Sequence, residues 1–192
     1  MSKTILFIHL VIWAILLFYW LISGLRAKKV AHQEPFVLRF VKYWFPVLLS
    51  VFLLGPGAWL GHSPLREQFI EHTNSVGIAG IVLCAMGAFI ACWSRFTLGK
   101  NWSLSVQEKQ GHELIKTGFY KVVRHPIYTG LLLMFFGTMI IVGDYKAIVA
   151  VAIMVVSFWF KLKKEEMVLM DAFGDEYKEY QSQTKALIPY II

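Results

Sequence analysis

Five long runs of apolar residues constrain the fold of this chain more than any other feature. A helix of about 20 apolar residues crosses the hydrocarbon core of a bilayer. With 57% hydrophobic residues in 192, the composition is that of an all-α integral membrane protein. We therefore predict one domain with five transmembrane helices. The runs cover residues 5–25, 43–60, 75–96, 127–142 and 147–160.

The distribution of positive charge predicts how these helices are oriented. The connections 26–42, 95–124 and 161–164 are rich in Lys and Arg, whereas 61–74 and 143–146 are not. Because basic loops stay on the cytoplasmic side, we expect the N-terminus outside and the C-terminus inside. The basic residues flank apolar runs, so lipid head groups account for the net charge of +7 better than a nucleic-acid partner does. The first run is expected to be retained, because Arg26, Lys28 and Lys29 follow it in place of a cleavage site.

Other local signals are simpler. Cys84 and Cys92 are eight residues apart in one apolar run, roughly 12 Å on a helix, which is too far for a disulfide. The sequence has no metal-binding spacing, phosphate loop, dinucleotide fingerprint or nucleophile triad. Residues 163–183 show apolar side chains at spacings of three and four, which predicts an amphipathic helix on the cytoplasmic surface.

The polar interval before the fourth run contains a candidate anion site. Pro126 suits the first turn of a helix, which places His125 at the helix entrance beside Arg124. A helix N-terminus carries free N–H groups and partial positive charge, so it favours a carboxylate or a phosphate. An ordinary loop with a capping histidine and a positive-inside arginine would have the same sequence.

Two further segments can contribute to a site. Glu165 and Glu166 follow the fifth run, where carboxylates are either solvated or turned into the bundle to bind a ligand. Lys161 lies four residues before Glu165, hence on the same helical face. The stretch 112–115 suits a loop whose backbone and apolar side chains hold an adenine-like ring.

Taken together, these segments resemble the isoprenylcysteine carboxyl methyltransferases and the wider group of membrane methyltransferases that includes phospholipid N-methyltransferases. The resemblance covers about half of the chain, from residue 98 to the end. The matching stretches are GKNWS (99–103), GHELI (111–115), GFY (118–120), RHPIY (124–128), EE (165–166) and FGDEYKEY (173–180). The five-span count is similar to that of small prokaryotic members, which implies an inner-membrane location with the site facing the cytoplasm.

The resemblance implies S-adenosylmethionine as methyl donor. It assigns residues 1–97 to three spans, and 98–192 to a cofactor-binding part with a helical hairpin and the C-terminal helix. The implied donor-binding residues are Gln107, His112, Glu113, Leu114, Ile115, Tyr120, His125, Pro126, Ile127, Tyr128, Glu165 and Glu166.

The resemblance also implies an acceptor with a carboxylate and a lipid-like or prenyl chain. The carboxyl methyltransferases have an arginine four residues before the donor-binding glutamate, and Lys161 stands there in this chain. Lysine keeps the charge but loses the bidentate fork. We expect Lys161 or Arg124 to orient the acceptor. Phospholipid or small-amine N-methylation, a non-enzymatic membrane scaffold and, more remotely, a sterol-type reductase are the alternatives.

Overall fold

The computed structural model describes residues 1–25, 35–99, 113–189 and 191. Within these residues the chain is helical, and its two β-bridges, Gln68 with Asp144 and Val123 with Lys185, are isolated. The helices are α1 (Lys3–Gly24), α2 (Phe36–Arg39), η1 (Phe40–Trp44), α3 (Phe45–Leu54), η2 (Gly57–Leu60), η3 (Pro64–Arg66), α4 (Asn74–Leu98), η5 (Gly118–Lys121), α5 (Pro126–Val142), α6 (Tyr145–Phe173) and α7 (Asp175–Gln183).

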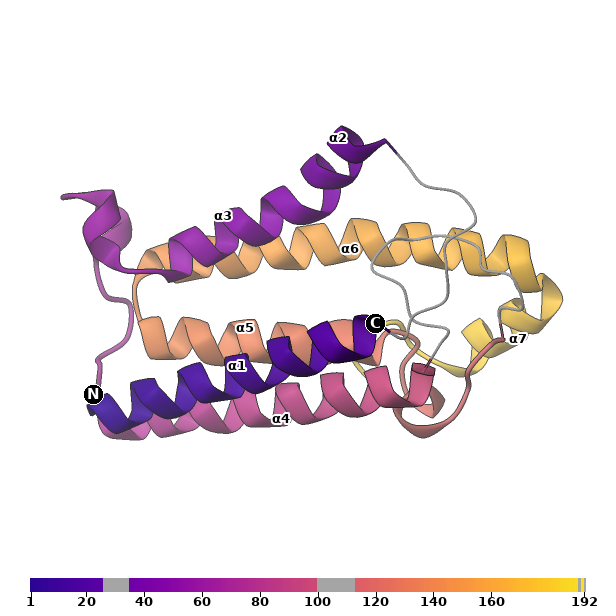
Figure 1. Cartoon of the computed structure of the whole chain (residues 1–192), viewed down its shortest axis with the longest axis horizontal. Coiled ribbons are helices and arrows are strands. Elements are labelled where there is room, and N and C mark those ends of the chain that lie inside the picture. Colours follow the sequence, from indigo (N-terminus) through magenta and orange to yellow (C-terminus); the bar gives the residue numbers. More distant parts are fainter. Residues whose placement is uncertain (26–34, 100–112, 190, 192) are drawn as a thin grey trace.

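The long helices pack in series across the molecule. α1 packs on α4, α4 on α5, α5 on α6, and α6 on α3 (Figure 1). Four helical stretches have the length and composition to cross a membrane: Lys3–Gly24, Val37–Leu54, Asn74–Leu98 and Tyr145–Phe173. α5 is apolar but has only 17 residues. The structure therefore confirms a helical membrane protein with four candidate spans among the described residues, and the predicted fifth crossing depends on α5.

Close backbone contact explains the packing of α4 against α5. A Cβ added to Gly87 would lie 2.4 Å from the carbonyl oxygen of Gly130, and one added to Gly130 would lie 2.5 Å from that of Gly87. Gly80 and Gly137 meet in the same reciprocal way, at 2.7 and 2.5 Å. Small residues that allow two backbones to approach are a common device in membrane helix pairs.

Two predicted boundaries are wrong. The amphipathic helix expected over 163–183 is not one element, because α6 continues from the membrane-spanning part to Phe173. No Gly or Pro interrupts the chain between Phe160 and Lys163, whereas Gly174 has a φ of +52° and separates α6 from α7. The second span also begins earlier than predicted, since α2 starts at Phe36 and places Arg39 and Lys42 on the helix.

Three other local features complete the comparison. The second apolar run extends to residue 60, but its helix ends at Leu54, just before the Gly55-Pro56-Gly57 segment, because Gly and Pro interrupt helices. The hairpin turn between α5 and α6 is tight, with Gly143 at a φ of +70°. Cys84 and Cys92 are both free thiols.

Candidate active site

The entrance of α5 is fastened by the C-terminal segment that follows α7. The N–H groups of Arg124 and His125 donate to the carbonyl oxygens of Lys185 and Ala186, at 2.8 and 3.0 Å. Pro126 occupies the first turn, where its missing N–H costs no helical hydrogen bond. These contacts fix the backbone of His125 at the helix N-terminus, as the sequence predicted, with a brace that the sequence did not reveal.

His125 lies between two carboxylates of α6. Its Nδ1 is 3.4 Å from Oε2 of Glu165, and its Nε2 is 3.5 Å from Oε1 of Glu166. The imidazole side chain is only 5% exposed, and Nε2 makes no hydrogen bond among the described residues. Burial disfavours the charged imidazolium, but the two carboxylates outweigh burial and raise the pKa of His125 above 6.5.

Tyr128 links this histidine to Glu165. Its hydroxyl donates to Oε1 of Glu165 at 2.5 Å, and its ring stacks on His125 with centroids 5.6 Å apart. The opposite neighbour is Phe158 of α6, whose ring centroid is 5.0 Å away. Glu165 is therefore held by a phenol and an imidazole, yet its side chain keeps 24% of its surface exposed. A partly exposed carboxylate with fixed geometry is suited to binding a cationic or hydroxyl group of a ligand.

Arg124 and Glu166 form a second, more buried pair. Arg124 Nε donates to Oε1 of Glu166 at 2.8 Å, and the two side chains are 10% and 7% exposed. The same guanidinium donates to the carbonyl oxygens of Gln181 and Thr184, at the end of α7. The Arg124 side chain thus ties α6 to the C-terminal segment, and Glu166 faces Arg124 and His125.

Lys161 lies one helical turn before Glu165, on the same side of α6. Its ammonium is 5.5 Å from the ring centroids of both Tyr43 and Tyr128, in a double cation–π contact. Tyr43 comes from η1, so this lysine joins the second span to the α5–α6 pair. The Lys161 ammonium is the cation expected for an acceptor carboxylate.

Tyr120 packs on the other side of the site. It is 6% exposed, its hydroxyl is 3.4 Å from the carbonyl oxygen of Ser94, and its own carbonyl accepts from Tyr180 of α7 at 2.7 Å. Burial raises the pKa of Tyr120, and it raises that of Tyr180 to about 12. Both phenols are therefore neutral hydrogen-bonding groups near neutral pH.

One cavity of about 510 Å³ connects these residues. That volume is within the range of cofactor and small-molecule sites. The polar and aromatic lining comes from η5, the entrance and first turns of α5, α6 and Arg39 of α2, and the apolar wall comes from α1, η1 and α3. The predicted residues that line it are Tyr120, Arg124, His125, Ile127, Tyr128, Lys161 and Glu165.

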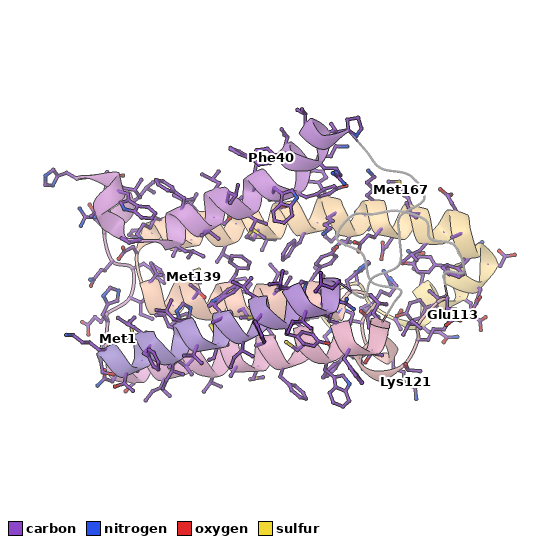
Figure 2. All side chains as sticks on the ribbon, in the orientation of Figure 1. Met1, Phe40, Glu113, Lys121, Met139 and Met167 are labelled. Atoms are coloured by element: carbon purple, nitrogen blue, oxygen red, sulfur yellow. The ribbon has the colours of Figure 1, made fainter. Side chains whose placement is uncertain are left out.

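The other predicted residues divide into three groups. Pro126 and Glu166 are buried next to the cavity without lining it. Glu113 is exposed, Leu114 and Ile115 are half-buried, and none of the three lines the cavity. Gln107 and His112 lie outside the described residues. Figure 2 shows Glu113 and Lys121 at the end of the bundle opposite Met1, which is the end where the site lies.

Sequence reasoning missed the apolar wall. Trp13, Leu16, Leu17 and Trp20 line the cavity from α1, at the i, i+3, i+4, i+7 spacing of a single helical face. The stripe of two tryptophans was a usable signal, but in an apolar span it also suits packing or lipid contact. Tyr43 and Trp44 of η1 complete this wall.

A sequence profile of the phospholipid methyltransferases matches residues 76–176, which is more than half of the chain. The chain belongs to the phospholipid methyltransferase family. The matched part contains almost all of α4 and the whole of η5, α5 and α6, hence His125, Lys161 and Glu165. The wall built by α1 and η1 lies outside the matched region.

Individual members of the phospholipid methyltransferase family resemble the chain over a longer stretch. The human protein-S-isoprenylcysteine O-methyltransferase is 29% identical over 178 residues, which are 90% of this chain and 60% of the human protein. The Tribolium castaneum enzyme of the same name is 31% identical over 168 residues, 84% of this chain and 54% of that protein. A probable protein-S-isoprenylcysteine O-methyltransferase of Oryza sativa subsp. indica is 29% identical, and the match covers 62% of that protein. The chain thus spans little more than half the length of these relatives.

A solved structure agrees with these relatives. The eukaryotic intramembrane Ras methyltransferase ICMT, an isoprenylcysteine carboxyl methyltransferase, matches with a TM-score of 0.56 and 27% identity. The match covers 78% of this chain and 53% of that protein. The helical arrangement is therefore shared with an intramembrane methyltransferase.

Proposed function

We propose that this protein is a membrane methyltransferase that uses S-adenosylmethionine and esterifies the carboxylate of an isoprenylated or similarly lipid-like acceptor. The observation that carries the proposal is that one cavity brings together His125, Glu165 and Lys161. A carboxylate suited to a cationic donor and an ammonium suited to an anionic acceptor then line the same space. The names of the similar proteins support the same reaction.

The residues of the cavity fit the donor. S-adenosylmethionine supplies a methyl group activated by a sulfonium. Glu165 is placed to accept hydrogen bonds from its ammonium or ribose hydroxyls. The N–H groups in the first turn of α5 suit its carboxylate. Tyr120 and Tyr128 line the cavity in which the donor would be bound, and Gln107 and residues 112–115 complete the proposed set.

Lys161 binds the acceptor carboxylate in this proposal. A carboxylate is already ionised near neutral pH, so the site needs no strong general base. The protein's work is to hold the acceptor oxygen in line with the donor and to exclude water. Arg124 is less suited to touch the acceptor, because it is engaged by Glu166 and the carbonyls of Gln181 and Thr184. It keeps α6 and the C-terminal segment in place.

A second hollow accommodates the lipid part. An apolar groove of about 840 Å³ runs between α3 and α6, with Lys42 and Lys164 at the end nearest to Lys161. Along α6 its lining extends from Ile148 to Lys164, about 24 Å of helix, the scale of a long hydrocarbon chain. We infer five crossings with the site at the cytoplasmic face of an inner membrane, so that an acceptor anchored in the cytoplasmic leaflet reaches Lys161.

The family description favours one other reaction, N-methylation of a phospholipid amine. A cationic Lys161 in the cavity opposes a protonated amine acceptor, whereas it attracts a carboxylate. The charge of Lys161 therefore favours a carboxylate acceptor, whose methylation gives an ester.

The decisive experiment uses purified full-length protein and donor labelled in the methyl group, and it offers N-acetyl-S-farnesylcysteine and phosphatidylethanolamine as acceptors. We expect a labelled product that releases methanol in base, as a methyl ester does. A base-stable label on phosphatidylethanolamine, with no ester, would replace our proposal with N-methylation.

Donor binding is measured separately by calorimetry with S-adenosylhomocysteine. Glu165→Gln should weaken binding by about tenfold or more, since it removes a charged hydrogen-bond acceptor. Glu71→Gln, at an exposed position on the other end of the bundle, should bind like the wild type. If the wild type itself does not bind, the protein is not a methyltransferase of this type.

A further inference from the structure

The lipid-facing groove and the site cavity share two lining residues, Tyr43 and Lys161. The remaining lining residues of each hollow belong to that hollow alone. The phenol ring of η1 and the lysine of α6 therefore form the partition between the two hollows. Any molecule whose chain lies in the groove and whose head lies in the cavity passes this pair.

Contacts with neighbouring side chains define the positions of Tyr43 and Lys161 in this partition. The Lys161 ammonium is 5.5 Å from the Tyr43 ring centroid and at the same distance from that of Tyr128. Tyr128 is in turn fixed by its 2.5 Å hydrogen bond to Glu165 and by its stacking on Phe158. Tyr43 is half-buried and accepts from Lys164 Nζ at 3.5 Å. The Tyr128 ring on one side of Lys161 is thus held in place by two contacts, and the Tyr43 ring on the other side is supplied by the second span.

The local backbone places Tyr43 in this position. Residues Phe40–Trp44 form a π-helical turn, closed by the Phe45 N–H donating to the carbonyl of Phe40, directly before Pro46. Such a turn shifts the register of the side chains relative to a regular helix, and π turns occur often at functional sites. In Figure 1 the α2 end of this span stands farther from α6 than the α3 end. The ring of Tyr43 contacts Lys161 within this widening.

We propose that Tyr43 is a positioning residue for acceptor binding, because with Tyr128 it holds the Lys161 ammonium at the boundary between groove and cavity. This inference rests on the proposed function, in which Lys161 binds the acceptor carboxylate. A lysine has a flexible stem and no planar fork, so its charge needs external support to meet a carboxylate in one geometry. The aromatic faces of Tyr43 and Tyr128 supply that support.

The test compares Tyr43→Leu, Tyr43→Phe and Phe45→Leu in the full-length protein. Phe45 is two residues farther along the same span, is exposed, and lines neither hollow. Steady-state methylation of N-acetyl-S-farnesylcysteine gives kcat and the KM of each substrate. Quenching of tryptophan fluorescence gives the acceptor Kd without donor, and calorimetry gives the S-adenosylhomocysteine Kd.

We expect Tyr43→Leu to raise the acceptor KM and Kd by about fivefold, the effect of one lost cation–π contact. Its kcat and its S-adenosylhomocysteine Kd should stay within twofold of the wild type. Tyr43→Phe, which retains the ring, should restore the acceptor values, and Phe45→Leu should match the wild type. If Tyr43→Leu does not bind S-adenosylhomocysteine, Tyr43→Met replaces it, because Met preserves volume without the aromatic face.

Three results would overturn the inference. The acceptor KM and Kd could be unchanged in Tyr43→Leu, or kcat and donor affinity could fall with them in both Tyr43→Leu and Tyr43→Met, as for a structural residue. Tyr43→Phe could also behave like Tyr43→Leu, which would assign the effect to the hydroxyl. If the wild type makes no ester at all, the proposed function is wrong; if it does and Tyr43→Leu is normal, only this inference is.

Discussion

Arg124 forms a buried ion pair with Glu166 and also donates to the C-terminal segment. We expect this pair to stabilise the folded protein. Removing one partner of a buried ion pair leaves the other charge uncompensated, at a cost of about 3 kcal/mol. We expect Arg124→Ala to lower the thermal unfolding midpoint in detergent by roughly 6 to 12 °C. Lys116→Ala removes an exposed pair with Glu176 at 2.8 Å and should shift the midpoint by no more than about 2 °C. Equal shifts in the two variants would contradict this assignment.

His125 makes stability depend on pH. Its pKa is raised in the folded protein by Glu165 and Glu166 despite burial, so folding favours the protonated form. The resulting stabilisation is fully present below pH 6.5 and is lost as the pH rises through the raised pKa. The unfolding midpoint of the wild type should therefore exceed that of His125→Gln most at or below pH 6.5, and the difference should shrink above it. A pH-independent difference between the wild type and His125→Gln would exclude the contacts of His125 with Glu165 and Glu166 as its cause.

At the scale of elements, α4 and α5 form the pair on which the position of His125 depends. A methyl group added at Gly87 would lie 2.4 Å from the carbonyl oxygen of Gly130, so the two helices must separate to accept it. We expect Gly87→Ala to destabilise the protein by about 2 kcal/mol, in the range of overpacked cores, and to weaken S-adenosylhomocysteine binding. Ala85→Leu on the exposed face of α4 should change stability by about 0.5 kcal/mol or less, measured by the same unfolding curves. A stable Gly87→Ala protein with normal binding would mean that the contact of α4 with α5 is not tight.

The elements also show what sequence could and could not predict. The long apolar runs predicted α1, α4, α5 and the membrane-spanning part of α6 within a few residues, because their hydropathy is continuous. The boundary between α6 and α7 is wrong in the sequence prediction, which starts a new helix at residue 163, where the polar stretch begins. The backbone has no interruption there, and it is Gly174 that separates the two helices. His125 and Glu165 were predicted as site residues because they are polar residues next to spans, and Tyr128 was added by the family resemblance. Tyr43 and the Trp13 wall were not, because aromatic residues in a span carry no local signal of what they face.

At the scale of the whole molecule, two ends of the bundle differ in charge and in role. Among the described residues the site end carries the exposed or half-buried lysines 42, 116, 121, 163 and 164, whereas the exposed basic residues of the other end are Lys3 and Arg66. Lys146, also at that other end, is 2% exposed and donates to the carbonyl oxygens of Leu53 and Gly55, so it contributes little charge to the surface. This distribution supports our proposal that the site faces the cytoplasm.

Contacts at the far end support our proposal that α5 is a fifth crossing. The N–H of Phe69 donates to the carbonyl of Gly143 at 2.9 Å, and the N–H of Tyr145 donates to that of Glu67 at 3.0 Å. The turn after α5 is thus bound to the connection that precedes α4, at the end opposite His125. α5 has 17 residues, the lower limit for a transmembrane helix, and its two ends lie at opposite ends of the bundle, as the proposed fifth crossing needs.

Cysteine labelling tests this five-span topology directly. In a background with Cys84→Ala and Cys92→Ala, single cysteines replace the exposed residues His62, Tyr145 and Lys121. A membrane-impermeant maleimide should label His62→Cys and Tyr145→Cys in intact cells, and Lys121→Cys only after permeabilisation. Labelling of Lys121→Cys alone in intact cells would reverse the orientation and put the site outside. Protection of Tyr145→Cys together with labelling of His62→Cys would mean that α5 does not cross, and the donor site would then need a different placement relative to the cytoplasm.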